Sequence, residues 1–164
     1  MAVYSIKTEQ FIPASLSTVW DFFSNPANLL TITPASMNFR VISKHHGTLM
    51  YPGQIIEYTV SPVLGIPLYW MTEITHVQAE QYFIDEQRFG PYRLWHHQHH
   101  FKQLDNGVAM TDIVHYKIPL WQLGDLAHAL FIKKQLQEIF RFRYQKTEEL
   151  FGKIPTQEFR IQIA

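Results

Sequence analysis

The chain has 164 residues, 46% of them hydrophobic and 15% aromatic, which fits one domain with a sizeable core. Lys and Arg number 14, as do Asp and Glu, so the chain offers no broad basic field and we expect no nucleic-acid partner. The absence of cysteine excludes disulfides, thiolate nucleophiles and cysteine zinc sites, and the absence of a long apolar run predicts a cytoplasmic protein without integral membrane contact.

The first part of the chain predicts one strand and two short helices. Residues 3–12 alternate as a strand does, and Ser15 or Ser17 can cap a short helix after it. The apolar positions of that helix are Leu16, Val19, Trp20, Phe22 and Phe23. Asn25-Pro26 predicts a second helix start, because proline at the first helical position loses no needed N–H. That helix should end near Thr33-Pro34, since the residue before proline disfavours the helical region.

The middle of the chain reads as consecutive strands. The expected strands are 37–44, 53–60, 69–78, 81–89, 92–103 and 108–118. Turn signals separate several of them, at Tyr51-Pro-Gly53, at Phe89-Gly-Pro91 and at Asp105-Asn-Gly107, of which the last is a good local hairpin signal. Short strands joined by such turns predict an antiparallel meander.

A long helix is expected next, from Leu123 to Phe151, ended by Gly152 with Pro155 beyond it. Its apolar stripe consists of Ile132, Leu136, Ile139, Phe140, Thr147 and Leu150. No linker or repeat divides the chain, so we expect a single domain over 1–152. Residues 153–164 are then a C-terminal tail without an assigned role.

This order of elements resembles the helix-grip fold of the START-like (SRPBCC) superfamily, which includes pollen allergens, lipid-transfer domains and polyketide cyclases. The segments that carry the resemblance are 17–26 (STVWDFFSNP), 83–87 (FIDEQ), 90–101 (GPYRLWHHQHHF) and 110–119 (MTDIVHYKIP). They are similar to a bacterial subfamily described only as ligand-binding. The resemblance implies an α+β fold in which a curved antiparallel sheet wraps around the C-terminal helix and leaves a cavity. The metal-ligand spacing and cluster cysteines of the oxygenase relatives are missing, so no iron chemistry is carried over.

Four histidines fall within five residues, His96, His97, His99 and His100. On a strand, period two puts His97 and His99 on one face with Trp95 and Phe101, and we expect this aromatic face to point inward. Asp85 and Asp112 lie on the neighbouring predicted strands. The length of the turn at Gly90-Pro91 decides whether Asp85 faces His97 or His96, and the sequence leaves this open.

Three interpretations of the inward histidines remain open. They are core residues satisfied by nearby carboxylates, they hold the polar end of a ligand, or they take part in catalysis or metal binding. Metal is the weakest, because a third ligand must come from a neighbouring strand, so we expect no metal and no cofactor. In an enzyme, His97 or His99 with Asp85 or Asp112 would supply acid–base chemistry of the cyclase or dehydratase type. Tyr58, Tyr116 or Arg143 could then stabilise an oxyanion.

Arg143 falls on the apolar stripe of the long helix. It either extends its charge to solvent along the helix edge or contacts an anionic ligand. The full set of candidate ligand-binding residues is Tyr58, Trp70, Phe83, Asp85, Gln87, Trp95, His97, His99, Asp112, Tyr116, Leu136, Phe140 and Arg143.

The function expected first is the binding of a small hydrophobic or amphipathic molecule (lipid, polyketide or quinone-like) between the sheet and the long helix. One alternative is the acid–base enzyme, and whether the protein is an enzyme stays open. A second alternative is a regulatory interaction protein without a ligand. The expected oligomeric state is a monomer or a homodimer.

Overall fold

The computed structural model describes residues 2–43, 49–61, 65–119 and 131–164. Within these residues an eight-stranded antiparallel sheet has the strand order β2-β3-β4-β5-β6-β7-β1-β8. The strands are β1 (Tyr4–Ile12), β2 (Arg40–Val41), β3 (Gln54–Val60), β4 (Leu68–Gln78), β5 (Tyr82–Phe89), β6 (Leu94–Leu104), β7 (Gly107–Lys117) and β8 (Ile161–Ile163). The helices are α1 (Leu16–Phe23), α3 (Lys133–Phe151) and two 3₁₀ turns, η1 (Pro26–Asn28) and η2 (Ala35–Met37).

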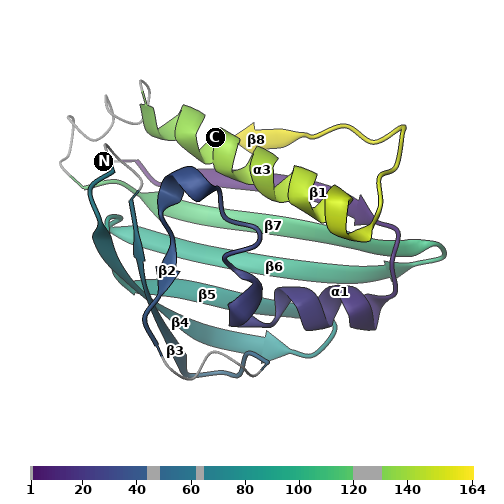
Figure 1. The fold of residues 1–164 in the computed structure, drawn as a ribbon, viewed down its shortest axis with the longest axis horizontal. Coiled ribbons are helices and arrows are strands. Elements are labelled where there is room, and N and C mark those ends of the chain that lie inside the picture. The colour runs from purple at the N-terminus through teal and green to yellow at the C-terminus, as the bar shows by residue number, and fades with distance from the viewer. Residues whose placement is uncertain (1, 44–48, 62–64, 120–130) are drawn as a thin grey trace.

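The helix α1 begins where the sequence predicts. Ser15, one of the two predicted caps, accepts a hydrogen bond from the Thr18 backbone N–H at 3.2 Å. The helix buries Val19, Trp20 and Phe23, and Trp20 packs edge-on against ring side chains of the sheet. This packing places α1 against β6 and β7 at one end of the sheet (Figure 1).

The expected second helix up to Thr33 is wrong in length. Asn25 caps it as predicted, but only the 3₁₀ turn η1 forms, followed by more i to i+3 backbone hydrogen bonds and then by η2. Only Pro26 and Ile32 are buried between residues 26 and 33, so no continuous apolar face exists to stabilise an α-helix there.

The expected strand over 37–44 is reduced to the two residues of β2, and its last residue lies outside the described part of the chain. The five following strands form the predicted meander. The hairpin at Asp105-Asn106 joins β6 to β7, with Leu104 paired to Gly107. A Cβ on Gly107 would lie 2.3 Å from the carbonyl oxygen of Ile12, so this position requires glycine.

Residues after α3 return to the sheet, which the sequence did not predict. The strand β8 pairs antiparallel with β1 and forms an edge of the sheet. Gln157 links this segment to β1 and α3 by hydrogen bonds. Its Oε1 accepts from the Phe11 backbone N–H at 3.0 Å, and its Nε2 donates to the Tyr144 hydroxyl at 2.8 Å.

The described part of the long helix, α3, crosses in front of the sheet (Figure 1). It buries Leu136, Phe140, Tyr144 and Thr147, whereas Leu150, expected on the buried stripe, is 46% exposed. The predicted first turns, from Leu123 to residue 130, lie outside the described residues.

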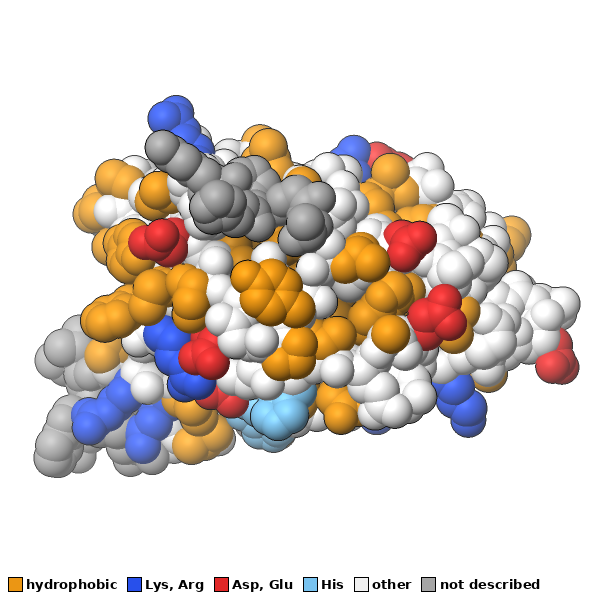
Figure 2. Space-filling model, turned by 90° about the horizontal axis from the view of Figure 1, so that it is seen from below, with side chains coloured by type: hydrophobic (Ala, Val, Ile, Leu, Met, Phe, Trp, Pro, Cys, Tyr) orange, Lys and Arg blue, Asp and Glu red, His pale blue; other side chains and the backbone are white. Residues whose placement is uncertain are grey.

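No helix in the described ranges has both the length and the apolar character needed to cross a membrane. On the face seen from below, hydrophobic side chains gather in several patches with charged side chains beside them (Figure 2).

Candidate functional site

A pocket of about 150 Å³ lies between the sheet and α3, and most of its wall is apolar. Strands β3 to β6 supply one side, α3 another, and the segment from Leu29 to Phe39 a third. The aromatic side chains in the wall contact one another. Tyr58 stacks on Trp70 at 5.8 Å between ring centroids, and Trp70 meets Trp95 edge-on at 5.5 Å. The Trp70 indole N–H donates to the Thr72 hydroxyl at 3.1 Å, so the polar edge of this ring is satisfied inside the wall.

Most of the candidate residues surround this pocket. Those in its wall are Tyr58, Trp70, Phe83, Asp85, Trp95, His97, His99, Leu136, Phe140 and Arg143.

Three candidates do not line the pocket. Gln87 holds the β5–β6 connection, since its side-chain amide bonds to both the N–H and the carbonyl of Tyr92. Tyr116 is fully buried in the core cluster that contains Leu136 and Phe140 of α3. Asp112 lies behind the two histidines and borders a much smaller cavity.

Sequence reasoning missed several wall residues, among them Ile32, Met37, Phe39 and Met50. They come from the 3₁₀ turn η2 and from segments without regular secondary structure, where no long period indicates the direction of a side chain. Thr72 was also missed, although it shares the inward alternation of Trp70 and Ile74 on β4 and could have been found from it.

The strand register determines how the histidines meet the carboxylates. Asp85 on β5 pairs with His97 on β6, and His99 pairs with Asp112 on β7, so the open question of the β5–β6 turn is answered in favour of His97. His97 and His99 are both buried and point inward, as expected.

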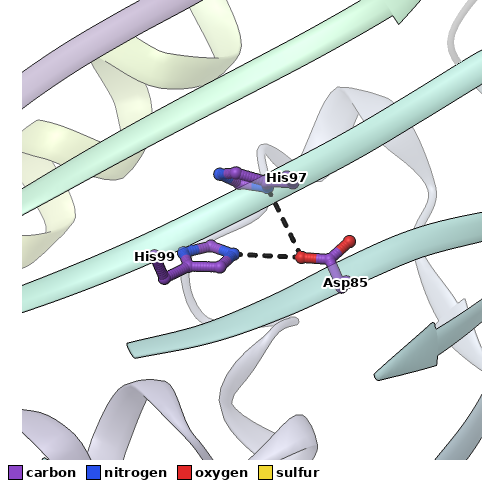
Figure 3. Close-up of side chains that lie close together, drawn as sticks. All are labelled: Asp85, His97 and His99. Carbon is purple, nitrogen blue, oxygen red and sulfur yellow. Dashed lines mark hydrogen bonds and ion pairs between the residues drawn. The ribbon is translucent and has the colours of Figure 1, made fainter. Parts of the chain in front are cut away.

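Each imidazole lies between the same two carboxylates. His99 Nε2 is 3.0 Å from Asp85 Oδ2, and His97 Nδ1 is 3.6 Å from the same oxygen (Figure 3). On the other side, His97 Nε2 is 3.0 Å and His99 Nδ1 2.7 Å from Asp112 Oδ1, although the second contact is too poorly aligned to be a hydrogen bond. The two rings are 3.8 Å apart between centroids.

Burial and mutual charge separate the pKa values within this cluster. Burial and the neighbouring charge of His99 lower the pKa of His97 to about 4. Burial also opposes the charged form of His99, but Asp112 and Asp85 outweigh it and raise the pKa of that imidazole. Burial opposes ionisation of both carboxyls, yet the two histidines lower the pKa of Asp85 and hold that of Asp112 well below its usual range. These shifts favour the carboxylate form of both acids, the charged imidazolium form of His99 and the neutral imidazole form of His97.

Arg143 completes the polar wall from the side of α3. Its guanidinium lies 5.6 Å over the Phe140 ring, and its Nη1 is 3.9 Å from Asp112 Oδ1. The side chain is only 16% exposed, so it does not extend to solvent. Its Nε and Nη1 are buried and have no hydrogen-bond partner among the described residues. Together, Arg143 and His99 balance the charge of the two carboxylates.

Comparisons with known proteins identify the fold. No protein-family model matches the sequence, and no curated protein matches it either. Among solved structures, a protein of Chromobacterium violaceum superimposes with a TM-score of 0.69 at 12% identity, covering 92% of this chain and 98% of that one. Ginseng major latex-like protein 151 from Panax ginseng gives 0.65 at 12% identity, with 91% and 97% covered. Ara h 8.0201 gives 0.57 at 14% identity, with 90% and 99% covered.

These likenesses concern the fold. The chain has the α+β helix-grip architecture, an antiparallel sheet with a long C-terminal helix packed on it, and its structural neighbours are START-like proteins of the Bet v 1 type. The resemblance predicted from the sequence is therefore confirmed at the level of the fold. Folds of this kind carry many activities, so the function must be argued from the site.

Proposed function

We propose that this protein binds a small, mostly apolar molecule with one anionic or carbonyl oxygen, held in the pocket between the sheet and α3. The observation that carries the proposal is Arg143, whose Nε and Nη1 are buried beside an apolar pocket and have no hydrogen-bond partner in the described part of the chain. Leaving a buried donor unpaired costs about 1–3 kcal/mol. An oxygen of a ligand in the pocket would accept these hydrogen bonds and recover that free energy.

The size of the pocket narrows the ligand class. A volume of about 150 Å³ is comparable to that of engineered apolar cavities that admit benzene. Ring-shaped molecules of the quinone or aromatic polyketide kind fit this volume better than long lipid chains. The aromatic wall of Tyr58, Trp70 and Trp95 offers flat surfaces for such rings.

Binding of 2-naphthoate tests the proposal, with 2-methylnaphthalene as the neutral counterpart. Trp70 and Trp95 line the pocket, so quenching of tryptophan fluorescence reports occupancy. We expect saturable binding of 2-naphthoate that weakens about 10-fold or more in Arg143→Gln, because a hydrogen bond to a charged group is lost. Binding of 2-methylnaphthalene should be nearly unchanged by this substitution.

Arg141→Gln is the matched control, because Arg141 lies on the same helix but over Phe159, outside the pocket wall. Thermal unfolding of each variant checks that the fold is intact. Failure of 2-naphthoate to bind the wild-type protein, or equal binding by both arginine variants, would contradict the proposal. Native mass spectrometry of the purified protein adds a direct search for a retained organic molecule.

Acid–base catalysis is a second candidate function, favoured by one observation. His97 and His99 both face the pocket, and their surroundings move their pKa values in opposite directions, which creates a base and an acid side by side. Neutral His97 would remove a proton next to a carbonyl, as cyclase or dehydratase chemistry requires. Among the described residues, no comparable observation favours an interaction protein without a ligand.

Deuterium exchange tests this second candidate. In D₂O, the wild-type protein should speed the exchange of the methyl protons of 2-acetylnaphthalene, and His97→Gln should lose the effect. An exchange rate equal to that in buffer alone would exclude this activity for the probe.

A further inference from the structure

Asp85, His97 and His99 present a set of metal-ligand atoms at the pocket wall. One donor atom from each of the three residues lies within 4.8 Å of the other two. We propose that these three side chains bind one divalent first-row transition-metal ion such as Zn²⁺. The sequence assigned no metal because the third ligand had to come from another strand, and the pairing of Asp85 with His97 now supplies it. The inference does not rest on the organic ligand, since the ion and the ligand bind through different atoms.

Two of the three donor–donor distances are close to those around a shared ion. Asp85 Oδ2 is 3.0 Å from His99 Nε2 and 3.6 Å from His97 Nδ1 (Figure 3). Two ligand atoms bound to one tetrahedral Zn²⁺ at about 2.0–2.1 Å lie about 3.4 Å from each other. Small shifts of the two rings would therefore place an ion between these atoms.

Asp112 would contact the two histidine ligands without binding the ion itself. Its Oδ1 lies 3.0 Å from His97 Nε2 and 2.7 Å from His99 Nδ1, so the ring nitrogen of each imidazole that faces away from Asp85 meets this carboxylate. A metal-binding histidine usually donates its other N–H to a carboxylate or carbonyl, which fixes the tautomer and the ring orientation. Here one buried carboxylate is hydrogen-bonded to His97 and lies in ion-pair contact with His99.

The remaining coordination positions would face the pocket. Asp85, His97 and His99 all line it, whereas Asp112 does not. Three protein ligands with an open position are typical of sites that also bind water or a ligand oxygen. With an ion present, the charges of the ion and Arg143 exceed those of the two carboxylates, which favours an anionic group at the open position. Metal binding and the acid–base role use the same ring nitrogens, so they exclude each other.

A metal titration of the full, untagged chain tests the inference. The protein is dialysed against a chelator, desalted and titrated with Zn²⁺ by calorimetry, and with Co²⁺ by visible absorption. We expect one ion per chain and a Co²⁺ spectrum of four or five ligands for the wild-type protein. Asp85→Asn and His99→Gln should each lose the ion, and Asp112→Asn should weaken binding about 10- to 100-fold.

His100→Gln is the matched control, because His100 lies on the same strand but bonds to Gln98 on the opposite face. It should bind the ion as the wild-type protein does. Circular dichroism confirms that each variant is folded, and a rise in the melting temperature of the wild-type protein with Zn²⁺ gives a readout without any substitution. The inference is overturned if the wild-type protein retains no ion, or if Asp85→Asn and His99→Gln bind as well as His100→Gln. Binding of 2-naphthoate in chelator tests the proposed function separately.

Discussion

The imidazole rings of His97 and His99 lie 3.8 Å apart and share two carboxylates, the partly buried Asp85 and the buried Asp112. Two imidazolium ions this close would repel each other strongly in a buried site. The pair therefore divides its protons unequally, and His99 keeps the charge because the carboxylates stabilise it more. In the metal-free protein this unequal division controls how the site responds to pH.

The first prediction concerns protonation of the metal-free protein. Since the pKa of His97 is lowered to about 4 and that of His99 is raised, His97 should stay neutral from pH 8 to about pH 5, while His99 stays protonated above its ordinary pKa of 6.5. Nitrogen-15 NMR of the ring nitrogens in the presence of a chelator measures both. Titration of the two rings together near pH 6.5 would contradict the assignment.

The second prediction is that the lowered pKa of His97 makes the free energy of unfolding depend on pH. Between the unfolded pKa of 6.5 and the folded pKa of about 4, His97 takes up a proton only in the unfolded chain. Its contribution to stability is therefore present above pH 6.5 and is lost as the pH falls toward 4. Urea unfolding at pH 7 and pH 4.5 should show a larger loss of free energy of unfolding for the wild-type protein than for His97→Gln. Equal losses would mean that the folded protein does not hold this ring neutral.

A third prediction is that Asp112→Asn is strongly destabilising. The substitution leaves His99 and Arg143 buried beside a neutral amide, and breaking a buried ion pair costs about 3–5 kcal/mol. Urea unfolding at pH 7 with a chelator measures the change. Asp105→Asn in the exposed β6–β7 turn is the control and should stay within about 0.5 kcal/mol of the wild-type protein. A similar small effect at both positions would refute the buried network.

Gly107→Ala tests the close approach of the β6–β7 hairpin to β1. The added Cβ would lie 2.3 Å from the Ile12 carbonyl oxygen, so strands must move, and a loss of about 2–3 kcal/mol is expected. Gly53→Ala is the control, because Gly53 also has a positive φ of 87° but has no atom within 4 Å of such a Cβ. Its loss should be about 1 kcal/mol, from the backbone conformation alone. Thermal or urea unfolding that ranks the two variants in the opposite order would contradict the contact.

The segment after α3 gives the last prediction. Gln157→Ala removes the acceptor of the Phe11 N–H and the donor to the Tyr144 hydroxyl, and should cost about 1–3 kcal/mol. Gln162→Ala on β8 is the control, since Gln162 is exposed. If both variants unfold at the same urea concentration as the wild-type protein, the segment does not stabilise the fold through Gln157.

Local patterns account for the parts of the fold that the sequence predicted. The cap at Ser15, the hairpin at Asp105-Asn106 and the inward face of His97 and His99 each depend on neighbours a few residues away. The short helix expected up to Thr33 was wrong because its start signal is local, whereas its stability requires a buried face that Leu30 and its neighbours do not provide.

In the candidate site, too, local patterns predicted some features, whereas others depend on distant parts of the chain. Alternation along β6 indicated which histidines point inward, but the pairing of Asp85 with His97 depends on the conformation of a loop. Tyr116 has the predicted inward direction, yet it is fully buried in a core cluster with Leu136 and Phe140 of α3, and no period in the sequence encodes where a distant helix packs. Met50 and Phe39 were missed in the pocket wall for a different reason, because they lie in segments without a regular period.

The position of β1 in the sheet has a kinetic consequence. This strand precedes both of its partners in the chain: it pairs with β7, about a hundred residues later, and with β8, which follows α3. A strand whose partners are so distant in the chain cannot be paired early, because the intervening loop must close first, and folding slows as such contacts dominate. Until β1 is paired, its apolar face stays exposed and can associate with other unfolded chains. We therefore expect refolding to be slow and sensitive to protein concentration, with the closing of β1 between β7 and β8 among its last steps.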